Sequence, residues 1–146
     1  MIDKLDFPPI WMIACMAVAW LLASLMPIYS FDISVRIVLG ILAAGFGLNI
    51  WSVLTLRKHI TPILPGKTPS TLVVDGPFRI NRNPIYTGAT VMILAVALWV
   101  GAISALIPVL FYPWIITRRF ILAEEKTLRS EFGDEAEAFL ANTRRW

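Results

Sequence analysis

Four long apolar segments constrain how this chain can fold. Residues 10–29 carry no charged side chain and are about as long as a helix that crosses a bilayer. Residues 35–56 form a second apolar segment, and residues 85–100 and 102–117 form a third and a fourth, separated only by Gly101. Backbone polar groups inside a bilayer must be paired within the protein. These segments therefore predict four membrane-spanning helices, the last two as a tight hairpin.

The composition agrees with a membrane protein. Hydrophobic residues make up 58% of the chain and charged residues 16%, which is too apolar for an ordinary soluble domain. Cys15 is the single cysteine, so a disulfide framework and a cysteine-based zinc site are both excluded. We expect membrane lipids as partners, no nucleic acid and no metal.

The basic residues indicate the orientation. In a four-span arrangement only Arg36 falls on one side of the membrane. The basic residues on the other side are Lys4, Arg57, Lys58, Lys67, Arg79, Arg82, Arg118, Arg119, Lys126, Arg129, Arg144 and Arg145. Cytoplasmic segments of membrane proteins are enriched in Lys and Arg. Both ends of the chain and residues 57–83 are therefore predicted to be cytoplasmic, with the protein in a bacterial inner membrane.

After the fourth apolar segment the chain becomes amphipathic. In "RRFILAEEKTLRSEFG" apolar residues recur near helical spacing, and Gly133 is suited to end that helix. A short final helix is predicted in "DEAEAFLANTRRW". Pro108 and Pro113 predict a bend in the fourth span, and a bent span can leave a crevice. The predicted fold class is all-α: an integral membrane bundle of about four transmembrane helices, with C-terminal amphipathic helices on the cytoplasmic side.

The segment "GPFRINRNPIYTG", residues 76–88, is unusually polar and stiff for its place beside an apolar helix. Asn83 followed by Pro84 is a strong helix-start signal, because Asn is a preferred N-cap and Pro fits the first helical position. A helix N-terminus beside Arg79 and Arg82 favours an anionic group. Anchoring on lipid headgroups would explain the arginines alone, but not the stiffness.

Glu124 and Glu125 follow the fourth span, and the predicted hairpin returns them to the level of Asn83. Adjacent carboxylates at a membrane surface are most often solvated. Opposite arginines and a helix N-terminus, however, they would suit a zwitterionic, amino-acid-like ligand.

These residues together resemble the isoprenylcysteine carboxyl methyltransferase family of integral membrane methyltransferases, which is related to phospholipid N-methyltransferases. The resemblance rests on "GPFRINRNPIYTG", the hairpin, "EE" and "EFG…RRW", over roughly residues 60–146. It implies one membrane-embedded methyltransferase domain over residues 1–146. Residues 1–56 would supply two spans and residues 57–146 the part that binds S-adenosylmethionine.

Carried over by position, the implied cofactor site consists of Arg82, Asn83, Pro84, Tyr86, Glu124 and Glu125, with Arg79 and Gly88 in the same motif. Many relatives have His where this chain has Asn83, so an imidazole role is lost there. No residue is assigned as a catalytic base. His59, the only histidine, is most simply a helix-end residue at the membrane surface.

The expected activity is transfer of a methyl group from S-adenosylmethionine to a lipophilic or membrane-delivered acceptor, which could be a carboxylate, thiol or amine. S-adenosylhomocysteine would be the product. Two other functions remain open. One is a non-catalytic membrane protein whose basic loop binds anionic lipids. The other is an NADPH-dependent membrane reductase, although no Gly-rich dinucleotide fingerprint is present.

Overall fold

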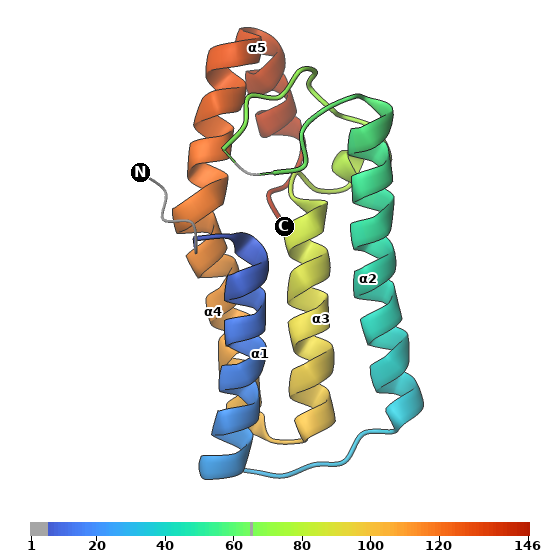
Figure 1. The fold of residues 1–146 in the computed structure, drawn as a ribbon, viewed down its shortest axis with the longest axis vertical. Helices are drawn as coiled ribbons and strands as arrows, with labels where there is room; N and C mark the ends of the chain where they lie inside the picture. Colours follow the sequence, from blue (N-terminus) through green and yellow to red (C-terminus); the bar gives the residue numbers. More distant parts are fainter. Residues whose placement is uncertain (1–5, 65) are drawn as a thin grey trace.

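The computed structural model describes residues 6–64 and 66–146, so Lys4 lies outside the described residues. The described residues form five α-helices, shown in Figure 1. They are α1 (Pro8–Leu25), α2 (Val35–Lys58), α3 (Pro84–Val100), α4 (Ile107–Ile116) and α5 (Leu122–Asn142). Short 3-10 turns span Gly76–Arg79 and Ile103–Leu106, and a π-helical turn, Thr117–Ile121, joins α4 to α5.

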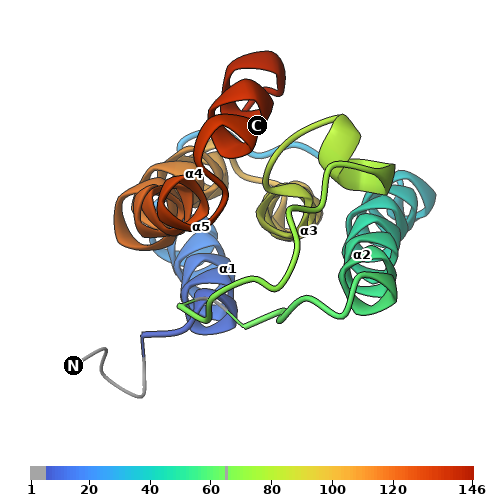
Figure 2. The same ribbon diagram turned by 90° about the horizontal axis from the view of Figure 1, so that it is seen from above.

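The helices run up and down in sequence, and α3 lies in the middle of the bundle (Figures 1 and 2). It contacts α2 most extensively and also packs on α1 and α4. The core of the bundle contains the fully buried side chains of Ile93, Tyr112 and Ile116. A central α3 therefore carries its first turn into the centre of one end of the bundle.

Three helical segments in the described part of the chain are long and apolar enough to cross a membrane. They are Pro8–Leu25, Val35–Lys58 and the run Ile103–Asn142, whose polar second half, α5, extends beyond the other spans (Figure 1). The central α3 is apolar but has only 17 residues. The predicted all-α membrane bundle is confirmed, with α1 ending at Leu25 rather than at residue 29.

The predicted hairpin forms, and glycine makes it tight. Gly101 caps α3 with φ 69°, in the left-handed region, and its N–H donates to the carbonyl of Ala97. The Phe31 N–H donates to the Gly101 carbonyl at 2.8 Å, so the α1–α2 connection crosses directly beneath the hairpin. A Cβ on residue 101 would overlap the carbonyl oxygen of Phe31.

Of the two prolines in the fourth span, only Pro113 lies in the interior of a helix. Pro108 lies in the first turn of α4, where its missing N–H breaks no helical bond, whereas Pro113 is inside the helix. The π-helical turn follows, and the Leu122 N–H donates to the carbonyl of Thr117. Such turns carry one extra residue and rotate the side chains that follow. In this protein the side chains that follow the turn belong to the first residues of α5, which include the glutamate pair.

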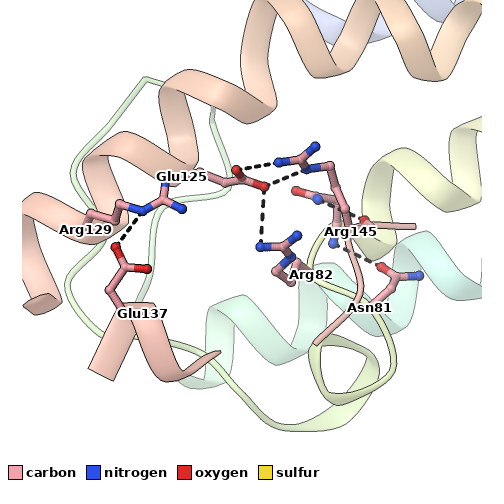
Figure 3. Close-up of polar contacts among 7 residues, drawn as sticks. Asn81, Arg82, Glu125, Arg129, Glu137 and Arg145 are labelled. Atoms are coloured by element: carbon pink, nitrogen blue, oxygen red, sulfur yellow. Dashed lines mark hydrogen bonds and ion pairs between the residues drawn. The ribbon is translucent and has the colours of Figure 1, made fainter. Parts of the chain in front are cut away.

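Gly133 divides α5 into two helices that fold back on each other. Its backbone has φ 49° and ψ −123°, which a glycine adopts readily. Across this turn Arg129 Nε donates to Glu137 Oε1 at 2.8 Å (Figure 3). The second half of α5 therefore runs back toward the start of α3.

Candidate cofactor site

A cavity of about 680 Å³ lies at the end of the bundle that carries most of the basic residues. Its walls come from the start of α1, the connection between α2 and α3, the first turn of α3 and the first half of α5. Six of the eight predicted site residues line it: Arg82, Asn83, Pro84, Tyr86, Glu124 and Glu125. Most of the remaining lining is apolar, including Phe7, Ile10 and Phe120.

Arg79 and Gly88 do not line this cavity. Arg79 ends the 3-10 turn that precedes α3. Gly88 is buried where α3 meets α2, and a Cβ there would overlap the side-chain amide of Asn49 and lie 2.7 Å from the carbonyl oxygen of Gly45. The structure therefore gives Gly88 a helix-packing position.

The first turn of α3 starts as the sequence predicts, but its cap is built differently. Pro84 occupies the first turn and Asn83 the N-cap position, where the Asn83 side chain makes no capping hydrogen bond. Its Nδ2 instead donates to the carbonyl of Arg145 at 3.0 Å, and its backbone N–H donates to Asn81 Oδ1 at 3.0 Å. The predicted side-chain cap is wrong, because this amide holds a segment distant in sequence.

Glu124 joins α5 to α3. The Tyr86 hydroxyl donates to Glu124 Oε1 at 2.7 Å, and Tyr86 is itself buried. Burial raises the pKa of the Glu124 carboxyl, although the Tyr86 hydrogen bond opposes that shift. Among the described residues, no cationic side chain forms an ion pair with Glu124. A cation in the cavity would therefore meet this carboxylate and stabilise its ionised form.

Glu125 is engaged on both of its oxygens. Arg145 donates from Nε to Oε1 at 2.7 Å and from Nη2 to Oε2 at 2.8 Å, and Arg82 Nη1 lies 3.6 Å from Oε1 (Figure 3). Burial of Glu125 opposes ionisation, but the hydrogen bonds from Arg145 and the charges of Arg145 and Arg82 hold its pKa below the usual value. The same contact raises the pKa of Arg145.

Arg82 lines the cavity and carries an unpaired donor. Its Nε is buried and has no hydrogen-bond partner among the described residues, while Nη1 faces Glu125. A buried guanidinium N–H without a partner is costly unless an acceptor is supplied. An anionic group bound in the cavity would supply one.

A second polar cluster holds the start of α1 against the π-helical turn. Trp11 Nε1 donates to Asp6 Oδ1 at 2.8 Å, and Arg119 Nη1 lies 2.8 Å from the same oxygen. The Arg119 guanidinium also stacks over the Trp11 ring, 4.8 Å from its centroid. These contacts hold lining residues of α1 beside the end of the fourth span.

His59 lies away from the cavity lining. It caps the end of α2, and its Nε2 is 2.9 Å from Asp75 Oδ1. The hydrogen bond from His59 lowers the pKa of Asp75. Within residues 6–64 and 66–146, no group of three or more His, Cys, Asp or Glu side chains is placed to hold a metal ion.

Two residues of this site escaped the sequence interpretation. Arg145 pairs with Glu125, and buried Asn81 donates from Nδ2 to Thr87 Oγ1 at 3.2 Å while accepting the Asn83 N–H. Asn81 sits within the quoted polar segment, and Arg145 within "RRW". Both residues lie in motifs that the sequence analysis singled out, but neither motif indicated which residue its side chain would contact.

The family model for phospholipid methyltransferases matches residues 34–135. That range is more than half of the chain and runs from the start of α2 through the first half of α5. The chain belongs to the phospholipid methyltransferase family. Comparison with curated proteins and with solved structures gives no significant match.

Membership of the phospholipid methyltransferase family confirms the resemblance to integral membrane methyltransferases. The cavity residues from Arg82 to Glu125 all lie within the matched range, whereas α1 and Arg145 lie outside it. The part of the cavity within the match therefore includes the α2–α3 connection, the α3 start and the glutamate pair. The lining residues outside the match come from the start of α1 and from the second half of α5.

Proposed function

We propose that this protein is an S-adenosylmethionine-dependent methyltransferase whose cofactor binds in the cavity between α3 and α5. The observation that carries the proposal concerns two residues that line one cavity. Among the described residues, the Glu124 carboxylate has no ion-pair partner and the buried Arg82 Nε has no hydrogen-bond partner. S-adenosylmethionine carries a sulfonium, an ammonium and a carboxylate. The family supports methyl transfer in general.

The residues present fit this cofactor. A cavity of about 680 Å³ is within the usual size range of small-molecule sites, and it combines a few polar groups with an apolar lining. Arg82 would hold the carboxylate, and Glu124, fixed by Tyr86, would face a cationic group. Bound there, the cofactor supplies an electrophilic methyl group on sulfur.

The protein's own contribution is alignment and exclusion of water. Transfer from a sulfonium needs donor and acceptor held in line, which is an effect of positioning. The ring of Phe120 and the apolar start of α1 would keep water from the reacting atoms and lie against the apolar part of an acceptor. We infer that the cavity faces the cytoplasm of a bacterial inner membrane and that residues 1–146 act as one domain.

We propose a phospholipid headgroup amine as the first acceptor to examine. The family description favours a phospholipid, and the apolar lining at Pro8 and Ile10 favours a lipid chain. Thiol and carboxylate acceptors are the alternatives, since these are nucleophilic without loss of a proton from nitrogen. A protonated amine must lose a proton before it can attack, and Glu124, which lines the cavity, is our candidate to receive it.

Calorimetric titration of nanodisc-held protein with S-adenosylhomocysteine tests the cofactor assignment. We expect saturable binding that is weakened about tenfold or more in Glu124→Gln, with NADPH as a comparison ligand that does not bind. Absence of binding by a folded parent protein would refute the proposal. Salt-sensitive binding to anionic vesicles without any affinity for S-adenosylhomocysteine would favour the lipid-binding alternative.

The acceptor is tested separately with cofactor that carries a labelled methyl group. Nanodiscs of phosphatidylethanolamine offer a primary amine, whereas matched phosphatidylcholine nanodiscs offer a fully methylated nitrogen. Label in the lipid of the first nanodisc and none in the second is expected. Label in neither, with S-adenosylhomocysteine bound, would exclude this amine and direct the search to thiols and carboxylates.

A further inference from the structure

The segment that follows α5 is fastened along the residues that lead into α3. The Arg82 N–H donates to the carbonyl of Arg144 at 2.9 Å, and Asn83 Nδ2 donates to the carbonyl of Arg145 at 3.0 Å. Asn81 and Arg144 form an isolated parallel bridge. Trp146 packs partly buried against the core cluster that contains Tyr86. Residues 143–146 are thus fastened to the segment that carries Arg82 and Asn83, although none of them lines the cavity itself.

The two adjacent glutamates have different surroundings. Glu125 is 5% exposed and both of its oxygens are occupied by Arg145, with Arg82 alongside (Figure 3). Glu124 accepts one hydrogen bond from Tyr86 and, in the described structure, has no ion-pair partner. Adjacent helical residues point about 100° apart. The Glu125 carboxylate can therefore pair with Arg145 while the Glu124 carboxylate remains available to a ligand in the cavity.

Arg82 both contacts Glu125 and lines the cavity. Its guanidinium touches Glu125 only at Nη1, 3.6 Å away, because the two short Arg145 contacts already satisfy that carboxylate. Its Nε has no hydrogen-bond partner within the part of the chain that the structure describes. If Arg145 were lost, Arg82 would be the remaining cation in ion-pair contact with this buried carboxylate, with Arg129 acting from farther away. Electrostatics would then draw Arg82 fully onto Glu125.

We propose that Arg145 is a positioning residue that removes Glu125 from the ligand-binding set and keeps Arg82 available to an anionic group. Glu124 is then the carboxylate that meets the cationic part of the ligand. This assignment rests on the proposed cofactor site. The family resemblance places both glutamates in the cofactor site, whereas this assignment leaves only Glu124 to contact the ligand. It also depends on Arg145, which lies outside the family match at 34–135.

A double-mutant cycle tests this division of roles. The variants are Arg145→Gln, Glu125→Gln and the two combined, each titrated with S-adenosylhomocysteine in nanodiscs and each melted without ligand. Arg145→Gln should weaken binding about tenfold or more, since an unpaired Glu125 would recruit Arg82. The double variant should recover to within about threefold of the parent, because residue 125 then carries no charge to recruit Arg82.

Two further variants make the pattern specific. Glu124→Gln should lose affinity at an unchanged melting temperature. Arg144→Gln is the matched control and should bind like the parent, because Arg144 is exposed and contributes only backbone contacts. If Arg145→Gln does not fold, Arg145→Lys provides a second test. It retains a positive charge that can pair with Glu125, and it should bind within about threefold of the parent.

A double variant that folds but binds as weakly as Arg145→Gln would overturn the inference, because Glu125 would then be needed for the ligand itself. Unchanged binding in Glu124→Gln would overturn it as well. A parent protein that binds no S-adenosylhomocysteine is a different result, since it removes the proposed cofactor site and this inference with it.

Discussion

The Tyr86 hydroxyl reaches the Glu124 carboxylate at 2.7 Å and so connects the first turn of α3 to the first turn of α5. Tyr86→Phe removes this hydrogen bond and little else. A hydrogen bond to a charged group contributes about 1.5–3 kcal/mol, so we expect S-adenosylhomocysteine to bind about tenfold more weakly. Isothermal calorimetry measures this change.

Tyr112→Phe is the matched control for that variant. Tyr112 is 1% exposed, and its hydroxyl has no hydrogen bond to any described residue. It does not line the cavity. Equal losses of affinity in the two variants would mean that the Tyr86 effect is a general consequence of losing a buried hydroxyl.

Gly88 should tolerate no side chain, for reasons of packing. The Cβ of Gly88→Ala would collide with Asn49 and Gly45 of α2. Overpacking of this kind typically costs about 1–3 kcal/mol, so a lower melting temperature in nanodiscs is expected. Gly47→Ala, on the same helix pair but with nothing within 4 Å of the added carbon, should melt like the parent. Equal melting of both variants would contradict the close α2–α3 contact.

Acid should destabilise the protein partly through Glu125. Its pKa in the folded protein is lowered, so its contribution to stability is complete above its unfolded pKa, about 4.3, and is lost as the pH falls through the folded value. The melting temperature should therefore decline below about pH 4.3, and more steeply in the parent than in the Glu125→Gln, Arg145→Gln double variant. Glu131→Gln, an exposed site, is the control. Parallel curves for parent and double variant would exclude this contribution.

Arg119 should control how firmly the start of α1 is held. Arg119→Ala removes the ion pair to Asp6 and the stacking on Trp11. Faster hydrogen exchange at the start of α1 is expected, with a small fall in melting temperature because these groups are partly exposed to solvent. Arg118→Ala removes a neighbouring exposed arginine and should leave exchange unchanged. Identical exchange in both variants would show that α1 is held by other contacts.

Local patterns in the sequence were enough for the helices and for one wall of the cavity. The Asn83–Pro84 start and the Gly101 and Gly133 breaks depend on neighbouring residues only, and each appears where expected. The glutamate pair reaches α3 because a hairpin of two similar helices returns the chain to its starting level.

The partners of these residues could not be predicted in the same way. Arg145 meets Glu125 only because the chain reverses at Gly133, and the register of that return depends on tertiary packing. The Asn83 amide has two acceptable uses, an N-cap and a tertiary bond, and only the presence of the Arg145 carbonyl selects the second. Gly88 reads equally well as a ligand contact or a packing residue until Asn49 is placed beside it.

The order of synthesis gives the Arg145 contact a consequence in time. Every apolar helix of the bundle leaves the ribosome before Arg145 does, so the spans can enter the membrane before Arg145 pairs with Glu125. In that interval Glu125 can form its ion pair with Arg82 but not yet the ion pair with Arg145. The nascent bundle is thus expected to hold its helices before the contacts of Glu125 are complete, and the return of the chain after Gly133 is the step that completes them.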